Sequence, residues 1–367
     1  MQKRHSLDLN LQDWEKWCLS KGYPLYNAKQ ILTWIFSNYC LEPPKFSNLS
    51  ENKRSALLDD FSWEPMRIDS HLKSQDGSEK ILLRTYDDLL IEMVLMPYKN
   101  RTTLCLSSQI GCKMGCTFCQ TGKMGLKRNL SSGEILYQLL LAKQLSPNVS
   151  NVVFMGMGEP LDNYDQVVKA CKAMIEPEYF NLSYSKVTIS TSGLIPQIEK
   201  LGNDLPVRLA ISLHSADQTA RSEMMPINKK YPLSELKEVL LKYPAPSRYG
   251  ITFEYVLIDG VNDSIPDAKK LVKYLHGIKA KVNLIPINHF PGLEMKASQE
   301  EKIRAFQSYL SKRSIPAPVR YSRGLDVSGG CGQLAAKRAT ELHLDPRVLH
   351  KQRRQESKLK LMPLGNS

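Results

Sequence analysis

The sequence predicts an α/β protein, a partial (β/α)6 barrel preceded by a small helical domain and a β connector. Strand-like and helix-like segments alternate from residue 101 to residue 312, a pattern typical of parallel strands joined by right-handed crossovers. Polar motifs follow almost every expected strand, as they do at the carboxyl ends of barrel strands. All four tryptophans lie before residue 65, which indicates a separate core at the N-terminus.

Residues 1–65 are expected to form the helical accessory domain, a candidate for RNA binding. Apolar residues recur at helical spacing within 11–19 and within 31–35. Glycine and proline residues punctuate the intervening segments. Cys18 and Cys40 fall within these apolar patterns and are interpreted as inert thiols.

Residues 66–100 change to the period of strands and form the expected β connector. Strands are predicted at 80–86 and 89–96, with a hairpin turn at Asp76–Gly77 after a preceding strand. Glu92 stands between apolar neighbours in the last of these strands. Taken alone, it is interpreted as an ordinary residue on a solvated strand face.

Residues 101–344 form the expected barrel core. The predicted strands are 102–107, 151–154, 186–190, 207–213, 250–258 and 281–286, each followed by helical sequence, and a last strand is expected at 319–321. A doubly wound sheet is the alternative. It is not favoured, because no G-x-G-x-x-G fingerprint follows the first strand.

The composition of the chain limits the kinds of partner that it is expected to have. The 367 residues carry a formal net charge of +13, which favours a polyanionic partner, nucleic acid before membrane; the alternative is that the excess charge serves solubility. No apolar run reaches the roughly 18 residues of a membrane span, and the polar N-terminus does not resemble a signal peptide. We therefore expect a cytoplasmic protein with reduced thiols. The basic tail, 345–367, is either an arm near RNA or a solvated end.

Three cysteines mark the first candidate site. Cys112, Cys116 and Cys119 have C-x3-C-x2-C spacing, and soft thiolates on so short a loop select zinc or an iron–sulfur cluster. A structural zinc site wants four protein ligands, and no fourth Cys or His follows closely. An iron–sulfur cluster held by three cysteines matches the number of ligands here. The alternative is a zinc site whose fourth ligand is a residue distant in sequence.

Polar residues at later strand ends mark a second candidate site. They are the Gly156–Pro160 stretch, Ser190–Gly193, Ser212–Ser215 and Asn288. Each alone is more often a turn, a helix cap or a structural histidine. On one rim of a barrel, beside a three-cysteine loop, they describe a ligand site.

Several longer stretches resemble a known family. Gly122–Leu130, Gly156–Leu161, Met225–Asn228 and Cys331–Leu334 are similar to the RlmN/Cfr family of RNA adenosine methyltransferases, within the radical S-adenosylmethionine (SAM) superfamily. The resemblance runs from about residue 10 to residue 340 and implies a TIM-type radical SAM barrel. These stretches are more specific than the cysteine spacing, so they favour an iron–sulfur cluster over zinc.

The resemblance implies a role for each matched residue. Cys112, Cys116 and Cys119 would hold a [4Fe–4S] cluster. Cys331 would carry the methyl group as S-methylcysteine, Cys105 would form a transient disulfide with Cys331, and Glu92 would be the proton acceptor. The residues expected to contact SAM are Gly158, Glu159, Ser190, Ser212, Leu213, His214 and Asn288.

The implied reaction consumes two SAM molecules. The Cys331 thiolate takes a methyl group from the first by polar displacement. The second yields a radical that abstracts hydrogen from the S-methyl group, and the resulting carbon radical adds to the electron-poor adenine C2. Glu92 and Cys105 are both candidates for the base that removes the C2 proton. Cys105 then releases the product by forming the disulfide, which must be reduced.

The resemblance also implies partners and competing functions. RlmN-like members methylate adenosine C2 in 23S rRNA, and in some cases in tRNA, whereas Cfr-like members methylate C8 of the same rRNA adenosine. The stretches 159–161 and 283–288 are more RlmN-like. An electron donor such as flavodoxin and a monomeric state are expected. A non-enzymatic, zinc-containing RNA-binding protein and a radical SAM methylthiotransferase also compete, but the remaining cysteines are too scattered for the methylthiotransferase.

Two departures from the family pattern stand near the cysteines. Gln120 occupies a position where alanine or serine is usual, and Gly329–Gly330 precede Cys331 where two alanines are usual. Neither removes a reacting group. The two glycines are expected to loosen the loop that carries Cys331.

Overall fold

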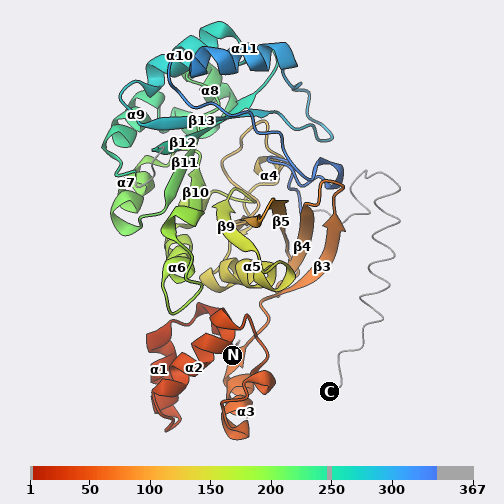
Figure 1. Cartoon of the computed structure of the whole chain (residues 1–367), viewed down its shortest axis with the longest axis vertical. Coiled ribbons are helices and arrows are strands. Elements are labelled where there is room, and N and C mark those ends of the chain that lie inside the picture. Colours follow the sequence, from red (N-terminus) through yellow and green to blue (C-terminus); the bar gives the residue numbers. More distant parts are fainter. Residues whose placement is uncertain (1–2, 246–249, 337–367) are drawn as a thin grey trace.

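A computed structural model describes residues 3–245 and 250–336 (Figure 1). Within these residues a nine-stranded sheet runs through the barrel and its flank. Its order is β13 (Ala280–Pro286), β12 (Ile251–Leu257), β11 (Arg208–Ser212), β10 (Val187–Thr191), β9 (Val149–Phe154), β6 (Arg101–Cys105), β5 (Leu90–Tyr98), β4 (Glu79–Thr85) and β3 (Met66–Lys73).

Within this sheet β6, β9, β10, β11, β12 and β13 pair in parallel, and each is followed by one or two helices. The helices are α5 (Ser132–Leu145), α6 (Tyr164–Ile175), α7 (Ile195–Asp204), α8 (Gln218–Met224), α9 (Leu233–Lys242), α10 (Ile265–Leu275) and α11 (Glu300–Ser311). This succession of βα units confirms the predicted partial (β/α)6 barrel. The helices cover one face of the curved sheet, as Figure 1 shows.

The barrel core lies between the sheet and these helices. Val187 and Ile189 of β10 are fully buried, as are Ile198 and Leu201 of α7. Apolar side chains recur at every second residue of the strand and at every third or fourth residue of the helix. Both sets therefore face the same interface. Burial of this kind is the main favourable contribution to the free energy of folding.

The strands of the expected β connector extend the same sheet. β3, β4 and β5 pair antiparallel with one another, and β5 pairs antiparallel with β6. The predicted turn at Asp76–Gly77 joins β3 to β4, and Gly77 has the positive φ of +84° that favours glycine there. Glu92 is fully buried, so the interpretation of Glu92 as a solvated strand residue is wrong.

The last predicted strand, 319–321, is wrong as well. Only an isolated bridge joins Val319 to Leu284 of β13. The carbonyl groups of Pro316 and Pro318 accept hydrogen bonds from β13, but proline has no N–H group to donate in return. A regular ladder therefore cannot form along this segment.

The N-terminal helices form their own aromatic core. They are α1 (Leu11–Ser20), α2 (Tyr26–Leu32) with a π-helical turn at Thr33–Ser37, and α3 (Glu51–Asp60). Trp14 packs against Phe61 with ring centroids 4.9 Å apart and against Trp63 at 6.0 Å. The short strands β1 (Arg4–His5) and β2 (Phe61–Ser62) pair in parallel and bring the two ends of this region together.

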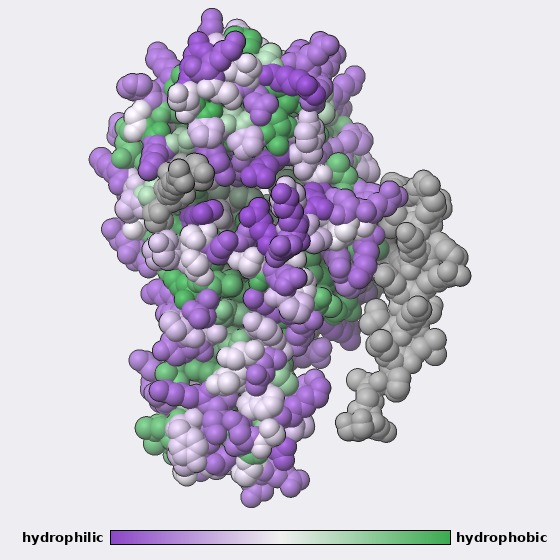
Figure 2. Space-filling view, in the orientation of Figure 1, coloured by the Kyte–Doolittle hydropathy of each residue, from purple (hydrophilic) through white to green (hydrophobic). Residues whose placement is uncertain are grey.

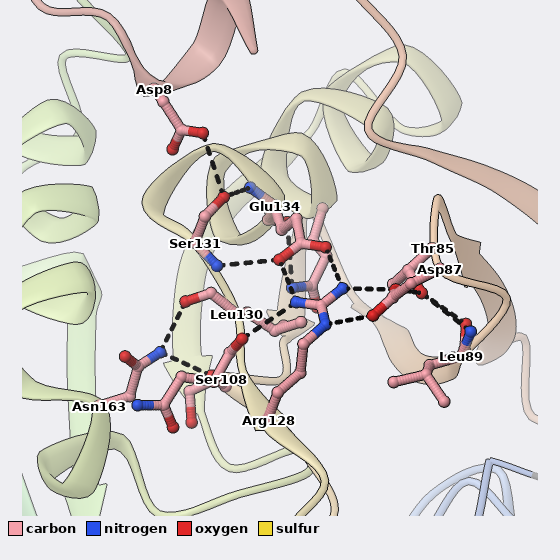
Figure 3. A network of polar contacts seen from close by, with 12 residues as sticks. Asp8, Thr85, Asp87, Leu89, Ser108, Arg128, Leu130, Ser131, Glu134 and Asn163 are labelled. Carbon is pink, nitrogen blue, oxygen red and sulfur yellow. Dashed lines mark hydrogen bonds and ion pairs between the residues drawn. The ribbon is translucent and has the colours of Figure 1, made fainter. Parts of the chain in front are cut away.

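Asp8 joins the N-terminal region to the barrel at the first turn of α5 (Figure 3). Its Oδ1 accepts hydrogen bonds from the Gly133 N–H at 2.7 Å and from Ser132 Oγ at 3.0 Å. Ser131 and Glu134 form the predicted capping box of the same helix. A carboxylate at a helix N-terminus is stabilised by the unpaired N–H groups and the helix dipole.

Arg128 continues this network toward the connector. It lies in β8 (Arg128–Asn129), and its guanidinium donates to both carboxylate oxygens of Asp87 and of Glu134. Asp87 belongs to the turn between β4 and β5, so the network joins that turn to the start of α5. The network therefore stabilises the segment that follows the three-cysteine loop.

The basic tail predicted at 345–367 lies outside the described residues. Among the described helices, none is both long enough and apolar enough to cross a membrane. Hydrophilic side chains cover most of the face seen in Figure 2, with apolar residues in smaller groups between them.

Candidate active site

The three-cysteine loop lies between β7 (Gln109–Ile110) and α4 (Gln120–Lys123). Backbone hydrogen bonds fold it tightly: the Cys119 N–H donates to the Cys116 carbonyl at 3.2 Å, and the Cys112 N–H donates to the Gly125 carbonyl at 3.2 Å. Gly111 has φ +75°, and a Cβ there would lie 1.8 Å from the Gly125 carbonyl oxygen. Only glycine fits this position.

The three thiols share one environment. Burial raises the pKa of Cys112 to about 12 and also raises the pKa of Cys116 and Cys119. The charges of Cys119 and Cys112 also contribute to the rise in the pKa of Cys116.

The arrangement can be compared with the two predicted metal groups. In the part of the chain that the structure describes, no three His, Cys, Asp or Glu side chains form a set that could hold a single metal ion. A four-iron cluster binds each thiolate through a different iron, so it needs neighbouring thiolates that do not converge on one point. Three thiols on one tightly folded loop are a donor set that fits such a cluster.

The loop after β9 brings Glu159 to the cysteines. Its carboxylate accepts hydrogen bonds from the backbone N–H groups of Leu161 at 3.1 Å and Ser192 at 2.7 Å. Burial raises the pKa of Glu159, and its charge in turn raises the pKa of Cys112. Gly158 has φ +105°, and a Cβ there would lie 2.6 Å from the Cβ of Gln109. A side chain at this position would push the Glu159 loop away from the cysteines.

The ends of β10 and β11 lie beside each other. Ser190 and Ser212 approach with their Oγ atoms 3.5 Å apart, and the Leu213 N–H donates to the Glu254 carbonyl at 3.0 Å. Nδ1 of His214 accepts from the Val256 N–H at 3.0 Å. Burial lowers the pKa of His214 to about 3, so this imidazole is neutral at physiological pH.

Asn288 holds the loop that carries Cys331. Its Nδ2 donates to the Cys331 carbonyl at 2.8 Å and to Ser322 Oγ at 2.7 Å. The Gly332 carbonyl accepts from the Gln120 N–H at 2.8 Å, and the Leu334 carbonyl accepts from Thr121 Oγ1 at 2.7 Å. The Cys331 loop is therefore fastened directly to the three-cysteine loop.

The two glycines before Cys331 are closely packed. A Cβ on Gly330 would lie 2.7 Å from Gln333 Oε1 and 2.9 Å from Leu325 Cδ2, and one on Gly329 would lie 3.2 Å from the Gly324 carbonyl. Alanine, usual in the family, would not fit at 330 without movement. Glycine here permits close packing, and the expected loosening of this loop stays a prediction.

The Cys331 loop reaches the end of β6, because a Cβ on Gly329 would lie 3.7 Å from Val94, which pairs with Cys105. Cys331 is exposed, although enough protein surrounds its sulfur to raise the pKa to about 12, and the charges of Cys119 and Cys105 add to that rise. Cys105 ends β6, where burial raises the pKa of its thiol to about 12. Cys18 and Cys171 are buried away from this site, whereas Cys40 is half-buried.

Glu92 pairs with Lys80 beneath the same loop. Lys80 Nζ lies 3.0 Å from Glu92 Oε1, and both side chains are almost completely buried. Glu92 Oε2 accepts from the Ala335 N–H at 2.9 Å, and Lys80 Nζ lies 3.4 Å from the Ser328 carbonyl. The pair thus contacts the chain on both sides of Cys331.

Sequence reasoning missed Lys80, Arg221 and Glu254. Lys80 lies opposite Val94 in the β4–β5 register, which makes Glu92 its diagonal neighbour. That register could have been proposed from the short turn at 86–89 that joins β4 to β5. Arg221 and Glu254 are buried polar residues of the barrel, and no local sequence pattern marks them.

The fold and the site define a class of protein. A partial barrel with a three-cysteine loop after its first strand is the arrangement of a radical SAM enzyme, and the model of the radical SAM superfamily matches residues 106–272. The ribosomal RNA large subunit methyltransferase N-terminal domain matches residues 6–61.

Individual relatives indicate which kind of radical SAM enzyme the chain resembles. The chain is 41% identical over 333 residues to the dual-specificity RNA methyltransferase RlmN of Syntrophobacter fumaroxidans, covering 90% of this chain and 97% of that protein. For the RlmN of Geotalea uraniireducens the identity is 42% over 337 residues, covering 92% and 98%. The crystal structure of a radical SAM methyltransferase from Sphaerobacter thermophilus is 39% identical with a TM-score of 0.88, covering 91% of this chain and 100% of that one.

The chain therefore belongs to the RlmN family of radical SAM RNA methyltransferases. This membership confirms the resemblance seen in the sequence and the prediction of an enzyme. The Cfr-like interpretation is not favoured, and the relatives are RNA methyltransferases rather than methylthiotransferases.

Proposed function

We propose that this chain methylates C2 of a specific adenosine in 23S rRNA, and an adenosine beside the anticodon in tRNA, through an S-methylcysteine on Cys331. The hydrogen bond from Gln120 to the Gly332 carbonyl carries most of the support. It joins the residue after Cys331 to the residue after Cys119, so a methyl group on Cys331 would lie beside the three-cysteine loop. The relatives' name, dual-specificity RNA methyltransferase, supports more than one RNA substrate.

The proposed cofactors are a [4Fe–4S] cluster held by Cys112, Cys116 and Cys119, and SAM. When bound, they supply the radical chemistry that an electron-poor aromatic carbon requires. SAM would lie at the strand ends, against Gly158, Glu159, Ser190, Ser212, Leu213, His214 and Asn288. The buried Glu159 carboxylate beside the cysteines offers a partner for an ammonium group.

Cys331 would act as the nucleophile. Its thiolate takes a methyl group from SAM by displacement at carbon. With a pKa of about 12, the thiolate is a minor species near neutral pH, so deprotonation contributes to the barrier of this step. The exposure of Cys331 leaves it accessible to an RNA base.

Cys105 would release the product. Its thiolate attacks the sulfur of Cys331 and a disulfide forms. The bond between that sulfur and the RNA-bound carbon breaks, and the carbon keeps the electron pair and takes up a proton to become the methyl group. The position of Cys105 near Cys331 supports this role. Turnover then requires a reductant for the disulfide.

Glu92 would accept the proton from adenine C2, with Cys105 as the alternative base. The ammonium group of Lys80, 3.0 Å away, compensates the charge of the Glu92 carboxylate. The hydrogen bond that Glu92 accepts from the Ala335 N–H, four residues after Cys331, supports this proposal.

The proposed partners follow from charge and class. The net charge of +13 supports a polyanionic substrate, and residues 1–65 are the candidate RNA-binding domain, with the tail at 345–367 as a second candidate. We propose a cytoplasmic monomer that receives electrons from a donor such as flavodoxin.

The test uses the full chain with its cluster reconstituted. Unmodified 23S rRNA and unmodified tRNA are incubated with SAM and a reductant without oxygen, and the nucleosides are identified by mass spectrometry. We expect 2-methyladenosine from both RNAs, and none from Cys331→Ala. Formation of 8-methyladenosine instead would contradict the proposal.

A further inference from the structure

Arg221 is an arginine with no exposed surface in the interior of the barrel. It lies in α8, and its guanidinium donates hydrogen bonds to the ends of β10 and β11. Nη2 donates to the Ser192 carbonyl at 2.7 Å and to the Ser212 carbonyl at 3.2 Å, and Nε donates to the Leu213 carbonyl at 3.0 Å. These carbonyl groups belong to the proposed SAM-binding segments, so Arg221 holds both strand ends in place.

Asn228 supplies the remaining hydrogen bond. Nη1 of Arg221 donates to Asn228 Oδ1 at 2.6 Å. Asn228 is itself fully buried, and its Nδ2 donates to the Gln218 carbonyl at 3.1 Å and to Ser222 Oγ at 2.7 Å. The Met225–Asn228 stretch, which resembles the family but received no role from the sequence, thus fixes the orientation of the guanidinium.

Among the described residues, Arg221 forms no ion pair, and its hydrogen-bond partners are three carbonyl groups and one amide. Burial lowers the pKa of Arg221 to about 10, so the group remains cationic at physiological pH. A buried charge without a counter-charge is costly. Its retention suggests that an anion normally lies nearby.

The three-cysteine loop is the neighbour that could supply this anion. The Thr117 N–H donates to the Met224 carbonyl at 3.0 Å, and the Pro226 ring lies 3.7 Å from a Cβ placed on Gly115. The segment joining Arg221 to Asn228 therefore contacts the loop on both sides of Cys116. The ring of His214, the residue after Leu213, lies edge to face against Phe118 of the loop, with ring centroids 4.8 Å apart.

We infer that Arg221, oriented by Asn228, is a positioning residue that provides the buried positive charge facing the proposed iron–sulfur cluster. Three thiolates give the ligand set a strong negative charge, and one-electron reduction adds another. A fixed cation beside Cys116 stabilises both states, the reduced one more. Arg221 thereby raises the reduction potential of the cluster while it holds the strand ends that bind SAM.

This inference rests on the proposed cluster, so the test separates the two. Full-length protein is reconstituted with iron and sulfide, and the midpoint potential is measured by a redox titration followed by electron paramagnetic resonance, without RNA. The dissociation constant for SAM is measured on the same samples. A wild-type chain that takes up no cluster would overturn the proposed cofactor, whereas a normal cluster with an insensitive potential would overturn only the role of Arg221.

Asn228→Asp is the main variant, because it keeps the acceptor for Arg221 and adds a negative charge beside it. We expect the equilibrium constant for reduction to fall about tenfold, equivalent to about 59 mV for one electron. Asn203→Asp adds the same charge at an exposed site on α7 and should leave the potential unchanged. Equal potentials in the two variants would contradict the inference.

Arg221→Lys and Arg221→Met separate charge from geometry. The lysine variant keeps the charge but loses the planar fork, so its potential should stay near the wild-type value while SAM binds more weakly. The methionine variant should lose both properties, whereas Arg304→Met, at an exposed position on α11, should lose neither. A methionine variant that takes up the cluster at the wild-type potential would contradict the inference.

Discussion

Two buried cations lie on opposite sides of the candidate active site, and only one has a counter-charge within the described chain. Lys80 lies in the antiparallel flank beneath the Cys331 loop, and Glu92 is 3.0 Å away. Arg221 lies under the parallel strand ends and the three-cysteine loop, and its hydrogen bonds go to carbonyl and amide oxygens. On the flank the buried cation has its carboxylate partner, whereas Arg221 on the parallel side forms no ion pair within the described residues.

The difference in charge pairing suggests that the antiparallel flank and the parallel strands have separate functions. In the proposed reaction the flank would present Cys331 to the RNA, and the ion pair and the close packing at Gly330 would hold the Cys331 loop in a fixed shape. The parallel side would bind anionic and charged cofactors, and an uncompensated cation is an advantage there. Each half can therefore be tested by a change that disturbs its own charge balance.

The largest effect is expected at Cys105, where the parallel and antiparallel strands meet. Cys105→Ala should still allow Cys331 to become covalently joined to RNA but should prevent release, so turnover stops after one event. Gel analysis of the protein–RNA adduct and quantification of free product measure both steps. Cys40→Ala, at a half-buried cysteine of the N-terminal region, should turn over normally. Multiple turnovers by the Cys105 variant would remove its resolving role.

The second effect concerns the ion pair of the flank. Lys80→Met leaves the Glu92 carboxylate buried without its partner, and breaking a buried pair in this way costs about 3–5 kcal/mol of unfolding free energy. Denaturant unfolding measures the loss. Lys80→Met combined with Glu92→Met should recover most of that stability while methylation of RNA stays absent. A single variant as stable as the wild type would show that the pair is not compensated as described.

A smaller effect is expected from Gly330→Ala. The new methyl group would lie 2.7 Å from Gln333 Oε1 and 2.9 Å from Leu325 Cδ2, and crowding of this kind typically costs about 1–3 kcal/mol. The Cys331 loop should shift, so methylation of Cys331 by SAM, followed by mass spectrometry of the intact protein, should slow. Unchanged methylation would mean that the loop tolerates displacement.

The smallest effect is expected where the N-terminal region docks. Asp8→Ala removes the acceptor for the first-turn N–H of Gly133, and loss of such a cap costs about 1 kcal/mol. Thermal unfolding should show a modest decrease in melting temperature, while methylation of Cys331 stays normal because Asp8 contacts the start of α5 rather than the Cys331 loop. A change in Cys331 methylation would indicate that the docking region influences the active site.

Much of the fold could be predicted from sequence because the signals are local. The alternation of strand and helix periods located the βα units, and Asp76–Gly77 located the turn between β3 and β4. The prediction of a strand at 319–321 was wrong. Its alternating apolar residues are typical of a strand, but Pro316 and Pro318 have no N–H group to donate to a β-ladder. Whether a proline prevents strand pairing depends on which neighbouring strand would need its N–H group, and the sequence does not show this neighbour.

The site was predictable only in part. The cysteine spacing and the strand-end residues are visible in the sequence, and their roles remain predictions. Burial of Glu92 depends on the flank joining the barrel sheet, which residue patterns alone did not indicate. The lack of a carboxylate beside Arg221 in the described chain depends on the packing of α8 against two strand ends, a contact between segments distant in sequence.

The central claim is that the methyl group travels through Cys331, and isotope labelling tests it most directly. The reconstituted enzyme is supplied with SAM that carries a fully deuterated methyl group, and the methyladenosine product is weighed by mass spectrometry. Because one deuterium is abstracted from the Cys331 S-methyl group and a proton replaces it at release, the product methyl should carry two deuterium atoms. A product that retains all three would mean direct transfer from SAM to RNA and would contradict the role of Cys331.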